Sequence, residues 1–91
     1  MLKITRVESN QKITLQLDGS VGGPWSELLR ASAESALAEG LQLTIDLENI
    51  CFIDCEGLVL INSLLGQGVQ QVNAPLFVAE QLRKCEAAEG D

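Results

Sequence analysis

The sequence lacks histidine and tyrosine altogether, and one tryptophan and two phenylalanines are its only aromatic residues. Without histidine, a catalytic triad with an imidazole base and a zinc site with histidine ligands are both excluded. Without tyrosine, acid catalysis by a phenol is excluded too. These absences remove most hydrolase mechanisms. We predict no catalytic residue, no cofactor and a protein that is not an enzyme.

Cysteines are few, and no long apolar run is present. Cys51, Cys55 and Cys85 are odd in number and lack the C-x-x-C spacing, and the N-terminal ten residues have no apolar signal core. We therefore expect reduced thiols rather than disulfides, and a cytoplasmic protein. No uninterrupted apolar stretch approaches the roughly 18 residues that a membrane span requires, so we expect no direct insertion into a membrane.

Positive charge is scarce and unevenly distributed. Six Lys and Arg stand against thirteen Asp and Glu, which gives a net charge of −7. From Ala31 to Leu82 there is no Lys or Arg, and seven acidic residues fall in this stretch. This balance opposes binding to nucleic acid and to anionic membranes. An acidic middle region would steer a basic partner, although it could equally be a solubilising surface.

The 91 residues, of which 46% are hydrophobic and 21% charged, fit one globular domain over residues 1–91. Alternating apolar residues and turn signals predict strands, and apolar residues at helical spacing predict helices. The predicted strands are 2–8, 12–18, 41–47 and 76–79, and the predicted helices run from Pro24 to a stop at Gly40, over 56–71 and over 80–87. The order ββαβαβα, with a hairpin first, predicts an α/β fold: a mixed four-stranded sheet covered by helices.

A turn is expected at 50–53, before the second helix. Two of the predicted helices have a defined apolar face. In the first helix, the predicted core residues are Trp25, Leu28, Leu29, Ala33, Ala36 and Leu37. In the second, they are Leu58, Ile61, Leu64, Leu65, Gly68, Val69 and Val72. The opposite face of the second helix would show Val59, Asn62, Ser63, Gly66 and Gln70, in a stretch that has no charged residue from Gly57 to Ala79.

The segment DLENICFIDCEGL, from Asp46 to Leu58, resembles the signature of the STAS domain, which is shared by bacterial anti-sigma-factor antagonists and the cytoplasmic tails of sulfate transporters. That signature reads D-L-x-x-V-x-F-[IM]-D-S-[ST]-G-L. The matching residues are Asp46, Leu47, Phe52, Ile53, Asp54, Gly57 and Leu58. The resemblance, which extends over roughly residues 3–84, implies the STAS fold and a role in binding a protein partner.

Three positions depart from the family pattern. Cys55 stands where phospho-switched STAS proteins have the Ser or Thr that accepts phosphate from an anti-sigma kinase, so this position cannot be phosphorylated in the usual way. Glu56 follows, where its carboxylate would lie in the first turn of a helix and could act as a fixed negative charge. Gly22 stands where an acidic residue often follows the second strand.

Each of these residues also has a purely structural interpretation. Asp54 fits the N-cap of the second helix, and Gly57 would permit close packing of that helix on a strand. Cys55 near a helix N-terminus could be a reactive thiol, but Glu56 beside it opposes the thiolate. Cys51 and Cys85 are interpreted as packing residues. Four acidic residues could gather around a cation, but the spacing of a calcium loop is absent, and we predict no metal site: Asp46, Glu48, Asp54 and Glu56.

An exposed helix face without charges is typical of the centre of a protein contact, although a face covered by the last helix would look the same. We predict a partner-binding site at Asp54, Cys55, Glu56, Gly57 and Val59. With the resemblance, this indicates a non-enzymatic interaction module in bacterial signalling, with an anti-sigma factor or kinase-like protein as partner. The alternatives are an accessory STAS subunit of a membrane transport complex and, third, a thiol enzyme or redox sensor.

Overall fold

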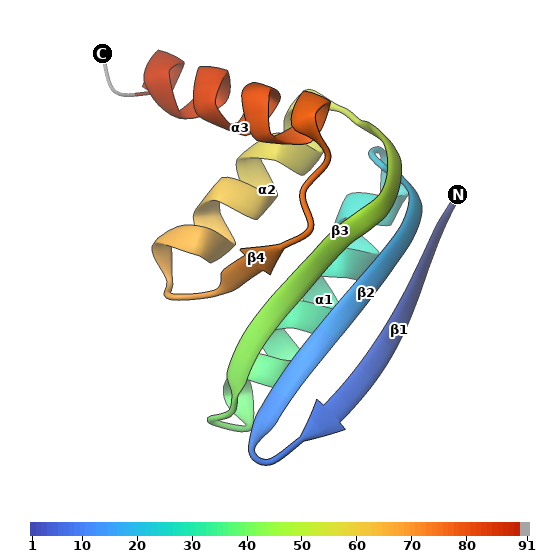
Figure 1. The fold of residues 1–91 in the computed structure, drawn as a ribbon, viewed down its shortest axis with the longest axis vertical. Coiled ribbons are helices and arrows are strands. Elements are labelled where there is room, and N and C mark those ends of the chain that lie inside the picture. The colour runs from blue at the N-terminus through green and yellow to red at the C-terminus, as the bar shows by residue number, and fades with distance from the viewer. Residues whose placement is uncertain (90–91) are drawn as a thin grey trace.

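The structure, a computed structural model, describes the backbone of residues 1–89 and the side chains of residues 1–84. The elements follow the predicted order ββαβαβα (Figure 1). They are β1 (Leu2–Ser9), β2 (Lys12–Val21), α1 (Pro24–Ala38), β3 (Gln42–Ile53), α2 (Cys55–Gly66), β4 (Gln70–Val72) and α3 (Leu76–Glu89).

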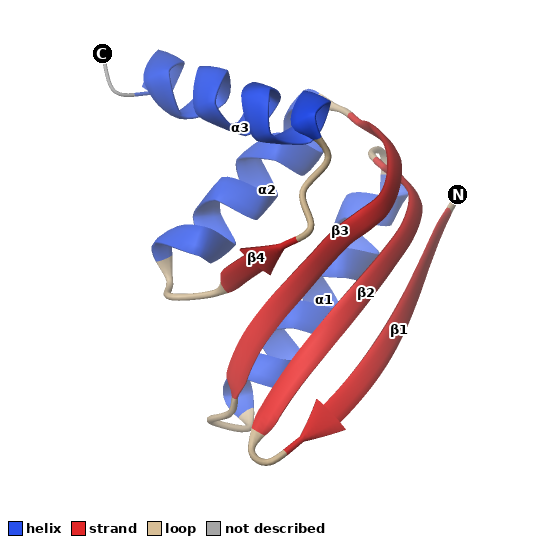
Figure 2. Ribbon diagram, viewed as in Figure 1, coloured by secondary structure: helices blue, strands red, loops and turns tan. Residues whose placement is uncertain are grey.

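One mixed sheet has the strand order β1-β2-β3-β4 (Figure 2). β1 pairs antiparallel with β2, whereas β2 with β3 and β3 with β4 pair in parallel. The hairpin closes through Asn10 and Gln11, whose φ angles of 46° and 68° are both positive, as a two-residue type I′ turn requires. The predicted hairpin and the mixed four-stranded sheet are confirmed.

The helices cover one face of this sheet. In Figure 1, α1 and α2 lie behind the sheet, and α3 lies at the end where β3 finishes and packs against α2. Along β2, Ile13, Leu15 and Leu17 are buried beneath the helices, whereas Gln16 and Asp18 are exposed on the opposite face. The strict alternation of the strand therefore separates the core from solvent.

The end of α2 corrects the predicted helix over 56–71. The helix stops at Gly66 because Gly68 takes a φ of 98°, which glycine adopts without strain. The Gly68 amide donates to Leu65 O at 3.1 Å and the Val69 amide to Leu64 O at 3.2 Å, which is the hydrogen-bond pattern of a Schellman motif. Val69 is buried after the turn, and the chain then forms β4.

The fourth strand was predicted in the wrong place. It lies at Gln70–Val72, where Thr44, Ile45 and Asp46 of β3 pair with it, and the predicted strand at 76–79 is the first turn of α3. Pro75 directly precedes this helix, and its carbonyl oxygen accepts a hydrogen bond from the Ala79 amide at 3.0 Å. A proline at this position costs no intrahelical hydrogen bond, because the first amides of a helix have no partner within it.

β3 also differs from the prediction, because it continues to Ile53 with no turn at 50–53. Irregularities in its pairing with β2 let the strand bend while Val21 still pairs with Ile53.

Burial corrects both predicted helix faces. Val72 is 40% exposed in β4, Gly68 is exposed, and Leu60, which was not predicted, is buried in α2. In α1, Leu28 is 44% exposed. The remaining predicted core residues of both helices are buried or half-buried.

Candidate functional site

The predicted site lies where β3 passes directly into α2 (Figure 1). Asp54 is the single residue between these elements. The strand ends beside Val21 of β2, and the Asp54 amide donates to Val21 O at 3.0 Å. The start of α2 is therefore fixed to the ends of two parallel strands.

The Asp54 side chain connects two segments of the chain. It caps α2, because Oδ1 accepts a hydrogen bond from the Gly57 amide at 2.8 Å. Oδ2 accepts from the Gly23 amide, at the start of α1, at 3.1 Å. The predicted N-cap is confirmed, and the same carboxylate also holds the loop before α1 against the start of α2.

Two glycines allow this close arrangement. A Cβ at Gly57 would lie 2.9 Å from Val21 O, so α2 can approach β2 only with glycine here, as predicted. A Cβ at Gly22 would lie 2.6 Å from Asp54 Oδ2. A side chain at position 22 would therefore displace the capping carboxylate, which gives a physical reason for glycine where an acidic residue was expected.

The other predicted site residues are on the surface. Cys55 is the first residue of α2 and Glu56 the second, and both are exposed. Val59, one turn further along, is 48% exposed. A carboxylate in the first turn is favourable for the helix dipole, so Glu56 holds its charge at the surface without strain.

A cleft of about 440 Å³ joins these residues to α1, and we call it the α1–α2 cleft. It is lined by Gly23, Ser26, Glu27 and Arg30 on one side and by Cys55, Glu56, Val59 and Leu60 on the other. The residues from α1 were not predicted as part of the site. No signal near the motif could have identified them, because they come from a helix some 25 to 30 residues earlier in the chain.

The polar groups of the cleft differ in how they are satisfied. Arg30 Nε lies 3.4 Å from Glu27 Oε1 in an exposed pair. Ser26 is only 5% exposed, and among the described residues its hydroxyl has no hydrogen-bond partner. An unpaired buried hydroxyl costs about 1–3 kcal/mol, so Ser26 is an unsatisfied group at the base of an open cleft.

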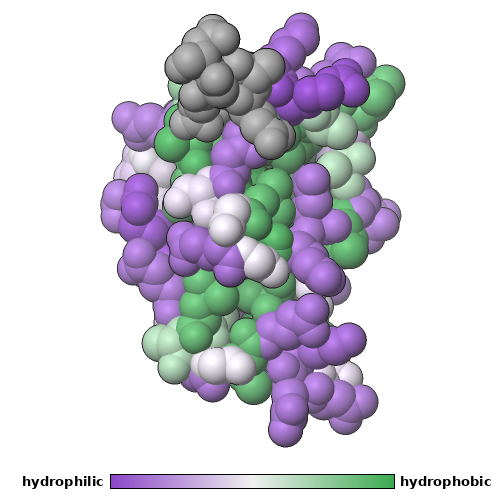
Figure 3. All heavy atoms as spheres, turned by 90° about the vertical axis from the view of Figure 1, so that its left-hand side faces the viewer, coloured by the Kyte–Doolittle hydropathy of each residue, from purple (hydrophilic) through white to green (hydrophobic). Residues whose placement is uncertain are grey.

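The charge-free face of α2 is partly covered. Asn62 is half-buried, and its Nδ2 donates to Leu82 O of α3 at 3.4 Å. Val59, Ser63 and Gly66 remain exposed, and Gln70 belongs to β4 rather than to the helix. Figure 3 shows a hydrophobic band with hydrophilic borders on this side of the molecule. The predicted exposure is therefore right for Val59, Ser63, Gly66 and Gln70 and wrong for Asn62, and Gln70 lies on β4 rather than on the helix.

The cysteine and acidic positions need one correction. Cys51 is exposed, with its Sγ 3.7 Å from Ser20 Oγ, so it is not the packing residue that was predicted. The Cys85 side chain lies outside the described residues. Asp46 has a local structural role, because its Oδ1 accepts from the Glu48 amide at 3.0 Å. Within residues whose side chains are described, no three metal-binding side chains gather.

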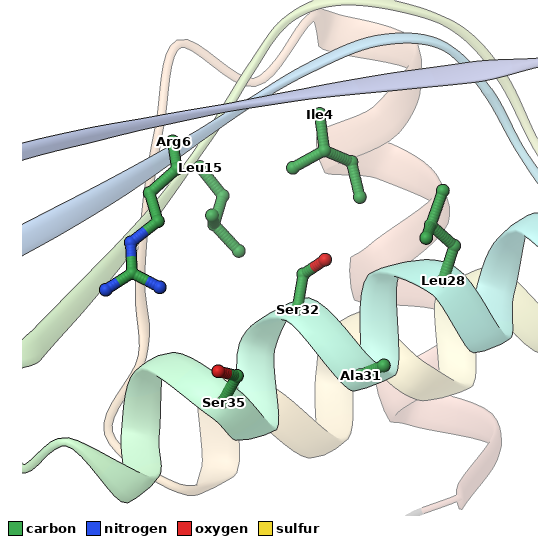
Figure 4. Close-up of a pocket in the computed structure, with 7 residues that line it drawn as sticks. All are labelled: Ile4, Arg6, Leu15, Leu28, Ala31, Ser32 and Ser35. Carbon is green, nitrogen blue, oxygen red and sulfur yellow. The ribbon is translucent and has the colours of Figure 1, made fainter.

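A second hollow of about 470 Å³ lies between β1 and α1, and we call it the β1 groove (Figure 4). Ile4, Leu15 and Leu28 give it an apolar lining, and Ser32 points into it. Arg6 Nη2 donates to Glu39 Oε2 at 2.6 Å, and this bond raises the pKa of the guanidinium above its usual value. The β1 groove contains no residue of the segment from Asp46 to Leu58.

No family model and no curated protein matches the sequence. Among solved structures, the fold is similar to the unphosphorylated form of the anti-sigma factor antagonist SpoIIAA, with a TM-score of 0.69 and 15% sequence identity. The similarity covers 91% of this chain and 82% of that one. None of the described helices is long and apolar enough to cross a membrane. With its ββαβαβα order and mixed sheet, the chain has the STAS fold that the segment from Asp46 to Leu58 indicated.

Proposed function

We propose that this chain is a non-enzymatic protein-interaction module of bacterial signalling that works in the cytoplasm. It binds its partner through the exposed Cys55 and Glu56 and through Val59 on the next turn of α2. Asp54, which caps the helix, and Gly57, which is buried against β2 rather than open to a partner, hold these residues in place. The observation that carries this proposal is the exposed, charge-free surface of α2, which begins directly beside an acidic helix start. A neutral contact centre with a charged rim is the usual anatomy of a protein interface.

The fold supports the class of partner. SpoIIAA, whose fold is similar, is an anti-sigma factor antagonist. By analogy, the partner of this chain is an anti-sigma factor or a related kinase-like protein. Because fold alone does not determine function, the proposal depends on the surface of α2 as well.

The usual phosphorylation switch is absent from this site. None of the residues from Asp54 to Gly57 carries a hydroxyl group, and Cys55 occupies the acceptor position. The Glu56 carboxylate supplies one fixed negative charge nearby, whereas a phosphate would supply nearly two and could be removed. The module therefore binds without a phosphate-dependent on and off state.

Intact mass spectrometry tests the missing switch. After incubation with an anti-sigma kinase that binds the chain, and with ATP, the mass of the wild-type protein should not change. The variant Cys55→Ser should gain one phosphate if the kinase still docks at this site. A phosphate mapped to residues 54–57 of the wild type would contradict the proposal.

A pull-down with tandem mass spectrometry separates the possible classes of partner. Recovery of an anti-sigma or kinase-like protein supports the proposal, whereas recovery of a permease with its ATPase would assign the chain to a transport complex.

The rate of alkylation by iodoacetamide at neutral pH measures the reactivity of the Cys55 thiol. If Cys55 reacts no faster than the exposed Cys51, a role as redox sensor or thiol enzyme is excluded.

A further inference from the structure

We infer that the α1–α2 cleft binds one cationic side chain, a lysine or an arginine, of the protein partner. This inference rests on the proposed function and adds the chemistry by which the partner is recognised. Three features of the cleft carry it. They are an unpartnered buried hydroxyl at the base, two carboxylates at the mouth, and an apolar wall along α2.

The hydroxyl of Ser26 has no hydrogen-bond partner among the described residues, and a molecule bound in the cleft could supply one. The residue is 5% exposed, and in the described part of the chain nothing bonds to its Oγ. Buried side-chain hydroxyls are almost always hydrogen-bonded in folded proteins. Because a serine oxygen can accept, an ammonium or guanidinium N–H that reaches the base of the cleft would satisfy it.

The charge of the cleft favours a cation. Glu27 and Glu56 line it from opposite helices, against the single cation Arg30. Arg30 is paired with Glu27, and Glu56 makes no ion pair within the described residues. The stretch from Ala31 to Leu82, which includes all of α2, contains no lysine or arginine.

The two helix starts beside the cleft do not make it an anion site. The dipoles of helix N-termini attract anions, but here the chain's own carboxylates already occupy both first turns, with Glu27 in α1 and Glu56 in α2. The Asp54 carboxylate also accepts hydrogen bonds from the Gly57 and Gly23 amides. An incoming phosphate or carboxylate would therefore meet three negative charges.

The apolar wall suits the long stem of a lysine or arginine. Val59, which is 48% exposed, and the edge of the buried Leu60 line the α2 side of the cleft together with Glu56. Basic side chains commonly lay their methylene groups along apolar surface and keep the charged head among polar groups. In the cleft, the stem would contact Val59 and Leu60 while the head reaches Glu56 and Ser26.

A small probe tests the chemistry directly. The full chain, labelled with 15N, is titrated with N-acetyl-arginine amide and, separately, with N-acetyl-citrulline amide, which has the same shape and no charge. We expect shifts of the Ser26, Glu27, Cys55 and Leu60 amides with the arginine probe, and much smaller ones with the citrulline probe. Equal shifts with both probes, or shifts confined to other surfaces, would overturn the inference.

Matched variants locate the charge and the hydroxyl. Glu56→Gln should weaken binding of the arginine probe about two- to fivefold, the range expected for one exposed charge pair. Glu48→Gln, which removes an exposed carboxylate outside the cleft, should leave it unchanged. Ser26→Ala should weaken probe binding without lowering the melting temperature. Equal effects of Glu48→Gln and Glu56→Gln would show a general charge attraction and contradict a site in the cleft.

The identified partner distinguishes this inference from the proposed function. If Val59→Asp abolishes the complex while the double variant Ser26→Ala, Glu56→Gln binds as the wild type does, the docking face stands and the cleft inference fails. If neither Val59→Asp nor the double variant weakens the complex, the proposed docking face and the cleft inference both fail. If both variants weaken the complex, and replacing one lysine or arginine of the partner gives no further loss in the double variant, both are supported.

Discussion

Two hollows in the described part of the chain, the β1 groove and the α1–α2 cleft, are nearly equal in size but differ in how their polar groups are satisfied. In the β1 groove, Arg6 is held by Glu39 at 2.6 Å and by Glu8 at 3.4 Å. In the α1–α2 cleft, the Ser26 hydroxyl has no partner among the described residues, and Glu56 is likewise without an ion pair. The difference teaches that volume alone does not mark a binding site. A hollow whose polar groups await partners is the better candidate.

The largest expected effect on stability concerns the close packing of α2 on β2 at Gly57. The α1–α2 cleft depends on this packing, and the β1 groove does not. Gly57→Ala would place a Cβ 2.9 Å from Val21 O, and we expect a loss of about 1–3 kcal/mol from overpacking. Gly66→Ala is the matched control, because its Cβ would meet nothing within 4 Å and should cost nothing or stabilise α2 slightly. Urea unfolding of both variants measures the difference in stability. Equal unfolding midpoints would show that α2 does not pack closely against β2 at Gly57.

The next effect concerns the carboxylate that ties the two sides of the cleft together. Asp54→Ala removes the N-cap of α2 and the acceptor for the Gly23 amide, and we expect a loss of about 1–2 kcal/mol. Asp18→Ala, on the exposed face of β2, should change stability by about 0.5 kcal/mol or less. Thermal melts followed by circular dichroism make this comparison. A loss for Asp18→Ala as large as that for Asp54→Ala would contradict the capping role.

A smaller change in stability, of opposite sign, distinguishes the α1–α2 cleft from the β1 groove most clearly. Ser26→Ala removes an unsatisfied buried hydroxyl and should leave stability unchanged or raise it by up to about 1 kcal/mol. Ser32→Ala, in the β1 groove, should stay within about 0.5 kcal/mol of the wild type. Denaturant titration gives both values, and a clear loss for Ser26→Ala would mean that this hydroxyl has a partner in solution.

The smallest effect is kinetic. Glu56→Lys reverses a charge at the rim of the proposed contact, so it should mainly slow association with the partner and make the association rate less sensitive to salt. Folding stability should fall by no more than about 1 kcal/mol, because the side chain is exposed and only its favourable position in the first turn of α2 is lost. Surface plasmon resonance at two salt concentrations provides the rates. An unchanged association rate would place the acidic helix start outside the encounter surface.

Much of the fold and part of the site could be predicted from local sequence. The hairpin and the Asp54 cap depend on residues close together in the sequence, and both are confirmed. The close packing at Gly57 is confirmed too, although the residue it packs against, Val21, is distant in the sequence. The end of α2 was missed because periodic apolar residues continue to Val72, whereas the chain turns at Gly68 to pair with β3. That choice is made by tertiary pairing, which local periodicity does not report.

The cleft could not be predicted because its two sides meet only through the fold. Ser26, Glu27 and Arg30 look like ordinary residues of an amphipathic helix until α1 is placed beside α2. Cys51 was interpreted as a packing residue, and regular alternation after Leu43, Ile45 and Leu47 would indeed turn it inward. The irregular pairing of β3 with β2 breaks that alternation, so that Ile50 and Ile53 are buried and Cys51 is exposed. In both cases the missing information was long-range contact.

The central claim is that the partner docks on the exposed surface of α2 at the end of the segment from Asp46 to Leu58. Binding of the identified partner to Val59→Asp, compared with Val7→Asp, tests it most directly, because these exposed valines are 48% and 43% accessible and lie on different elements. The account predicts that Val59→Asp weakens the complex by about 2 kcal/mol or more, since it places a charge in a desolvated contact, while Val7→Asp binds as the wild type does. Both variants should melt at the wild-type temperature. Unaltered binding by Val59→Asp, or equal losses for the two variants, would contradict the account.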